Sequence, residues 1–242
     1  LLSPAQSPLP GYIHIYPGGG GSNKQDAAFL GPRFAAVGLG NGQPPADIER
    51  PADLTLPADE HRNALRNAAD RRFARRRRTS FIDAYNQSYE QAEQLMRQRE
   101  VFDLSKEPAK ELDRYGSHDF GRHCLLARRL LEHNVTFVKI THSNYDTHFE
   151  NFDFHIEQLG EFDRPFATLI GDLGDRGLLK STLVIVMSEF GRTPNINHVL
   201  GRDHWGTAWS VALAGCGLHA GAVVGKTNAN GTAVVRSEEH TS

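Results

Sequence analysis

The stretch LVIVMSEFGR, residues 183–192, decides the fold class. Its first five residues are apolar without alternation, which is typical of a parallel strand covered on both faces. Residues 135–141, VTFVKIT, are β-branched and aromatic and predict another strand. Both strands end in polar runs, at 188–192 and at 142–148. A third apolar piece, residues 209–215, is either the next strand or a short helix.

Helical patterns separate these strands. An apolar stripe predicts a helix over 152–173 that closes at Gly174 to Gly177. A second stripe predicts a helix that Ser117 or Asp119 caps and that runs to about residue 131. The repeating order of helix, strand and polar tip predicts an α/β domain with helices layered on a mainly parallel sheet.

The ends of the chain differ from its middle. Residues 1–57 are rich in Gly and Pro and predict mostly loop, whereas 58–100 have the composition of a long helix or a helical pair. The chain starts at Leu1 without methionine, and residues 236–242 resemble a translated sequencing adapter, so we expect a non-native tail. The expectation is one partial domain over 1–235.

Composition argues against two classes of partner. The formal net charge is −2, and the arginine-rich run from Arg71 to Arg78 is flanked by acidic residues, so it predicts a solvated helix face and no nucleic acid. No stretch approaches the roughly 20 apolar residues that span a membrane. Cys124 and Cys216 lie in apolar runs and predict buried free thiols.

Chemistry-bearing side chains follow the predicted strands. Carboxylates and imidazoles at the carboxyl ends of successive strands form the mixed oxygen and nitrogen set that suits zinc, manganese or iron. Individually these residues also suit a helix cap, an ion pair with a neighbouring arginine or a surface turn. Together they predict a metal site whose ligands come from Asp146, His148, Glu189, Asp203 and His204.

Two arginines flank the predicted ligands. Arg192 and Arg202 carry guanidinium groups that match the oxygens of phosphate or sulfate, which favours binding of an anionic ester. The alternative is that they neutralise Glu189 and Asp203 through ordinary ion pairs.

Several blocks together resemble a bacterial family. They are 102–108, 115–131, YDTH at 145–148, 183–194 with its core MSEFGRTP, and GRDHW at 201–205, within coverage from about residue 9 to 235. The chain resembles the domain of unknown function DUF 1501, which is related to sulfatases and to the alkaline phosphatase superfamily. That resemblance implies a three-layer α/β/α fold of which this chain is a part.

The resemblance also implies ligand roles. Asp146 and His148 look like the first metal-binding pair, Glu189 like the acidic member of the second, and His204 like the late histidine. Phe190 stands where the superfamily usually has histidine, which puts a two-metal site in doubt and leaves room for Asp203.

The function implied by the resemblance is hydrolysis of sulfate or phosphate esters with one or two divalent ions, zinc or manganese. The substrate would be a small anionic ester or a sulfated or phosphorylated glycan. The nucleophile of such enzymes follows the first strand, and residues 1–57 show no such strand and tip, so we expect a fragment without it. A periplasmic or extracellular location is also implied. The alternative is a non-catalytic envelope or surface protein that binds glycans or partners on the same scaffold, and Phe190 favours it.

Overall fold

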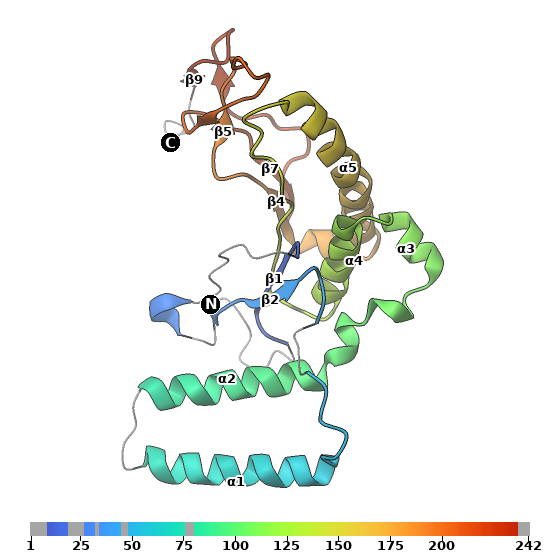
Figure 1. Cartoon of the computed structure of the whole chain (residues 1–242), viewed down its shortest axis with the longest axis vertical. Coiled ribbons are helices and arrows are strands. Elements are labelled where there is room, and N and C mark those ends of the chain that lie inside the picture. Colours follow the sequence, from blue (N-terminus) through green and yellow to red (C-terminus); the bar gives the residue numbers. More distant parts are fainter. Residues whose placement is uncertain (1–8, 19–26, 32–33, 45–47, 76–79, 237–242) are drawn as a thin grey trace. The chain divides into compact units, whose positions relative to one another are not determined.

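A computed structural model describes residues 9–18, 27–31, 34–44, 48–75 and 80–236. The chain divides into two compact units, residues 1–142 and 143–242, and each is described by itself (Figure 1). The predicted tail at 237–242 lies outside the described residues. The fold is mixed α/β, as predicted, with helices and one small parallel sheet.

The first unit is built on a three-stranded parallel sheet. Strand β1 (Tyr12–Tyr16) lies in the middle, with β2 (Val37–Gly40) on one side and β3 (Phe137–Ile140) on the other. Ile13 and Ile15 of β1 are completely buried. The prediction of mostly loop over residues 1–57 was therefore wrong for this segment. Five residues are enough for a central strand when both of its edges are paired, and the surrounding Gly and Pro residues hid the signal.

Helix α4 (Asp119–Glu132) packs against β1 and β3. Leu126 and Leu130 on this helix are fully buried in the hydrophobic core of the unit. The predicted side-chain cap is absent, because the residue at the capping position is His118 and makes no such bond. Asp119 instead accepts a hydrogen bond from Arg122, at 2.7 Å.

A helical pair covers most of the predicted range 58–100 and begins two residues before it, at Leu56 (Figure 1). The Thr55 hydroxyl caps its first helix by accepting from the backbone N–H of Ala58, at 3.4 Å. Arg71 and Arg72 are exposed, in agreement with a solvated face, whereas 76–78 lie outside the described residues. The two helices of the pair are α1 (Leu56–Ala74) and α2 (Ser80–Arg97). The described part of the unit also contains η1 (Ala28–Leu30), η3 (Arg99–Phe102), η4 (Leu104–Lys106) and α3 (Ala109–Tyr115).

The second unit opens with helix α5 (Asn151–Asp175), within two residues of the predicted bounds. Strand β4 (Leu183–Val186) then pairs with β7 (Ala212–Gly215), and this pairing is antiparallel. The prediction of a parallel strand was wrong here, because an apolar run predicts a strand without fixing the direction of its partner. The other elements are η5 (Leu178–Lys180) and two antiparallel pairs, β5 (Gly191–Arg192) with β6 (His204–Trp205) and β8 (Lys226–Thr227) with β9 (Val234–Arg236).

The two cysteines differ in environment. Cys124 is a buried free thiol on α4, as predicted, and burial raises its pKa well above the usual range. Cys216 is also free but exposed, because it lies in the turn that follows β7, with φ 50°. The prediction of burial was wrong for Cys216. No helix in the described ranges has the length and apolarity that a membrane crossing requires.

Two histidines are buried in the first unit. His14 on β1 is 3% exposed and shares a hydrogen bond of 2.8 Å with the Thr141 hydroxyl. His123 on α4 is 2% exposed, and its Nε2 has no hydrogen-bond partner. Gly42, at φ +64°, closes over this ring so tightly that an added Cβ would lie 2.8 Å from its Cδ2. Burial lowers the pKa of both imidazoles, and nearby Lys139 lowers that of His14 further.

We expect acid to destabilise the protein through these two groups. Because their pKa values are lower in the folded state, the unfolded chain binds more protons as pH falls below about 6.5. The free energy of unfolding should therefore be highest above that pH and fall by up to about 1.4 kcal/mol per pH unit for each histidine below it. Urea unfolding between pH 7.5 and 5 measures this slope. His123→Gln should flatten it, whereas His61→Gln, on an exposed part of α1, should not. Equal slopes in both variants would contradict the prediction.

Candidate metal centre

Two segments far apart in the sequence meet within the second unit. The residues around 147–151 precede and begin α5, and the residues around 197–202 form the loop between β5 and β6. Main-chain contacts join them: a bridge between Phe149 and Leu200, and hydrogen bonds from Glu150 N to Val199 O, Asn151 N to Leu200 O and Arg202 N to Thr147 O, at 3.0–3.1 Å. This pairing brings the residues that precede α5, including His148, close to residues 201–205.

Gly201 makes the close approach of these segments possible. A Cβ at this position would lie 1.8 Å from the carbonyl oxygen of His148 and 2.4 Å from the backbone nitrogen of Phe149. Such distances cannot be relieved by rotating a side chain, because both atoms belong to the main chain. Glycine is therefore required at 201 for His148 to hold its position.

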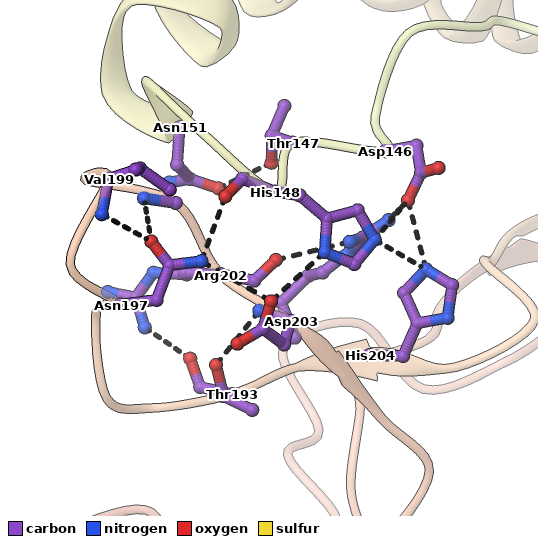
Figure 2. A network of polar contacts seen from close by, with 12 residues as sticks. Asp146, Thr147, His148, Asn151, Thr193, Asn197, Val199, Arg202, Asp203 and His204 are labelled. Atoms are coloured by element: carbon purple, nitrogen blue, oxygen red, sulfur yellow. Dashed lines mark hydrogen bonds and ion pairs between the residues drawn. The ribbon is translucent and has the colours of Figure 1, made fainter.

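Three predicted ligands converge where the segments meet (Figure 2). The Asp146 Oδ1 atom lies 3.1 Å from His148 Nε2 and 2.9 Å from His204 Nε2. The two Nε2 atoms are 3.1 Å apart. The three atoms thus form a nearly equilateral triangle, and they come from a loop and from β6.

The chemistry of this triangle fits a cation. Ligand atoms of a tetrahedral zinc site, with bonds of about 2.0–2.1 Å, lie about 3.3 Å from one another. The observed separations are within a few tenths of an ångström of that value. A carboxylate oxygen and two imidazole nitrogens are also all electron-pair donors, and bringing them together without a proton or cation between them costs free energy. Among the described residues, Asp146, His148 and His204 are the group whose atoms meet in this way.

Arg192 adds a positive charge beside the triangle. Its Nη2 donates to Asp146 Oδ1 at 2.6 Å, and its Nη1 donates to the carbonyl of Arg202 at 3.2 Å. The hydrogen bond from Arg192, followed by that from His204, lowers the pKa of Asp146 to about 2. Asp146 is thus ionised and ready to bind a metal at any pH near neutrality.

Asp203 lies behind His148 instead of beside the other ligands. Its Oδ1 accepts from His148 Nδ1, at 3.0 Å, on the opposite edge of the imidazole from Nε2. This hydrogen bond, followed by one from Asn197, lowers the pKa of Asp203. The arrangement of carboxylate, histidine and metal is the usual way in which proteins orient a ligating imidazole.

Glu189 is not brought into the group. Its side chain is exposed, and the group of three found in the described part of the chain does not include it. The next residue, Phe190, does reach the site: its ring centroid lies 4.4 Å from that of His204. Three of the five predicted ligands, Asp146, His148 and His204, thus lie together, and Glu189 is not part of this group.

The Arg202 side chain stabilises the loop between β5 and β6. Its Nη1 donates to the carbonyls of Thr193 and Pro194, both at 2.7 Å, which closes the turn between β5 and β6. Its guanidinium also lies 6.0 Å from the ring centroid of Phe152. A role of Arg202 in substrate binding stays a prediction.

Two residues that support the site, Thr147 and Asn197, were not predicted from the sequence. Thr147 lies between two ligands, but its side chain is buried and donates to Asn151 Oδ1 at 2.6 Å, which anchors the loop to α5. Asn197 bonds both loops (Figure 2). The available signals were the position of Thr147 between two predicted ligands and the polar residue Asn197 between Pro194 and Gly201.

Comparison with known proteins gives a family and no nearer relative. No curated protein and no solved structure matches the chain. A family model described as "Protein of unknown function (DUF1501)" matches residues 2–242, almost the entire chain. The chain with this three-donor centre therefore belongs to the DUF1501 family.

Proposed function

We propose that this protein is a metal-dependent hydrolase of sulfate or phosphate esters. One divalent ion, zinc or manganese, would be held by Asp146, His148 and His204. The observation that carries the proposal is the convergence of these three donor atoms within 3.1 Å of one another, beside the guanidinium of Arg192. Two imidazoles and one carboxylate are a ligand set of catalytic zinc sites, which leave a coordination position open.

The ion would supply a Lewis acid that polarises an oxygen of the ester. The protein itself contributes a fixed positive charge, the guanidinium of Arg192. Arg192 is fixed by two hydrogen bonds, so its cation stays at the edge of the centre. A fixed guanidinium there stabilises the negative charge that grows on sulfate or phosphate oxygens as the ester bond breaks.

One ion fits the centre better than two. A second ion needs further donors, and Glu189 lies apart from the group of three in the described residues. Phe190 packs on His204 with its ring centroid 4.4 Å away and offers no donor atom. The proposal is therefore a single-metal centre.

A second candidate function is metal-dependent binding without turnover. Phe190 favours it, and so do the hydroxyl groups beside the ligands. Thr147 donates to Asn151, and Thr193 donates to the carbonyl of Asn195 at 2.9 Å. Both hydroxyl groups are therefore engaged in hydrogen bonds that stabilise the loops. Under the hydrolase proposal the nucleophile is therefore neither the Thr147 nor the Thr193 hydroxyl. Under the alternative the protein is an envelope or surface component that binds glycans or partners.

The proposed substrate is a small anionic ester or a sulfated or phosphorylated glycan. The positive charge of Arg192 and of the ion supports an anionic group at the centre. A periplasmic or extracellular location is part of the same proposal and rests on the family resemblance.

We predict stoichiometric metal binding. Protein stripped with a chelator should bind one equivalent of zinc, measured by competition with a chromogenic chelator. Asp146→Ala and His204→Ala should each weaken binding by more than about 100-fold, because each removes a direct ligand. Glu189→Gln should leave the affinity within about threefold. Equal losses in all three variants, or no zinc in the wild-type protein, would contradict the single centre.

A further prediction concerns Gly201. Gly201→Ala should weaken zinc binding by roughly 10- to 100-fold, because the new methyl group displaces the main chain of His148. The matched control is Gly206→Ala, where an added Cβ meets no atom within 4 Å. Zinc titration with circular dichroism on each variant separates a lost site from a lost fold. Unchanged affinity in Gly201→Ala would show that this close approach does not hold the centre.

Catalysis is tested with 4-nitrophenyl sulfate and 4-nitrophenyl phosphate at saturating zinc. Arg192→Ala should lower kcat/KM for the accepted ester by about 100-fold. Lys180→Ala, which removes an exposed cation of the same unit, should have no effect. Zinc binding without release of nitrophenol from either ester would favour the binding protein.

A further inference from the structure

The residues behind the triangle form a network of their own. Asp203 Oδ1 accepts from His148 Nδ1 at 3.0 Å and from Asn197 Nδ2 at 3.3 Å. The main chain of Asp203 is fixed too: its N–H donates to the Thr193 hydroxyl at 3.1 Å, and its carbonyl accepts from the Thr193 N–H at 3.0 Å. The backbone of Asp203 is therefore fixed by Thr193, independently of the hydrogen bond between its carboxylate and His148.

Asn197 uses the full hydrogen-bonding capacity of its amide. Its Nδ2 donates to the carbonyl of His148, at 2.8 Å, as well as to Asp203. Its Oδ1 accepts from the N–H groups of Val199 and Gly201, at 3.0 and 2.9 Å. A primary amide has two donor hydrogens and two acceptor lone pairs, so no capacity is left over. One side chain thus connects the loop before α5 to the loop between β5 and β6 (Figure 2).

The network decides which nitrogen of His148 carries a proton. A carboxylate can only accept a hydrogen bond, so the Nδ1 atom that faces Asp203 carries the N–H, and in the neutral imidazole that binds a metal it carries the single ring proton. The lone pair is then on Nε2, the atom that faces Asp146 and His204. A metal ligand needs that lone pair, and the opposite tautomer would turn an N–H toward the ion.

We propose that Asp203 and Asn197 are positioning residues of the metal centre. Asp203 holds His148 in the tautomer that binds metal, and Asn197 holds Asp203 and the His148 backbone in register with each other. This inference rests on the proposed metal-dependent function, and it assigns to Asp203 a role that differs from that of a direct ligand.

The first test is zinc affinity in two variants. Asp203→Asn keeps an oxygen that accepts from His148 and should lose less than about tenfold, whereas Asp203→Ala should lose about 10- to 100-fold. A direct ligand would behave differently, because an amide and a methyl group are both poor zinc ligands and both variants would lose affinity alike. Asp163→Asn, an exposed site on α5 with the same change of charge, is the matched control. Affinity of Asp203→Ala within threefold of the wild type would overturn the proposal.

The second test reads the tautomer in metal-free protein at a fixed, mildly alkaline pH. Nitrogen-15 shifts of the His148 ring, assigned with His148→Gln, should show the proton on Nδ1 in the wild type and its loss from Nδ1 in Asp203→Ala. Asn197→Ala should show a mixture of both tautomers with a folded circular dichroism spectrum. An Nε2–H ring in the wild type, or the same tautomer in every variant, would overturn the proposal.

These readouts separate two kinds of failure. If the wild-type protein binds no zinc but the Nδ1–H tautomer depends on Asp203, the proposed function fails and the positioning network stands. If zinc binds tightly and substitution of Asp203 changes neither affinity nor tautomer, the proposed metal centre stands and this inference fails.

Discussion

The contact between Gly201 and the main chain of His148 is the constraint on which the centre depends. It allows two loops to lie against each other without a side chain between them, and the backbone hydrogen bonds of 147–151 with 199–202 follow from that approach. The distance between the imidazoles of His148 and His204 is set in turn by this backbone pairing. Main-chain geometry can therefore assemble the donor atoms before any ion arrives, which lowers the ordering cost of metal binding.

Much of the secondary structure follows from local sequence. The helical composition near 58–100 and the apolar stripe of α5 predicted their helices because each pattern extends over many residues. Strand β1 was missed because only five residues carry its signal between glycine- and proline-rich neighbours. The direction of β4 was wrong for another reason: an apolar run reports burial, and the partner strand β7 decides whether pairing is parallel or antiparallel.

The candidate site shows the same division. Asp146, His148 and His204 could be predicted because they carry the ligand atoms that metals require and lie in polar segments that follow predicted strands. The separation of Glu189 and the placement of Asp203 behind His148 could not be predicted, because both residues lie outside the regular strands and their positions depend on tertiary contacts such as the hydrogen bond from His148. The role of Asn197 could not be predicted either, since it depends on a hydrogen bond to the carbonyl of His148, 49 residues away in the sequence.

The side chains of Asp146, Thr147 and His148 point in two directions. The outer two point toward the three-donor group, and Thr147 between them is buried and bonded to Asn151 at the start of α5. The backbone N–H of His148 donates to the carbonyl of Asp146 at 3.1 Å, so a tight turn centred on Thr147 separates the threonine from the two ligands. Insertion or deletion of a single residue here would break that turn. A change of length within these three residues is thus incompatible with this arrangement of donors, whereas a substitution of Thr147 that keeps the bond to Asn151 leaves the turn intact.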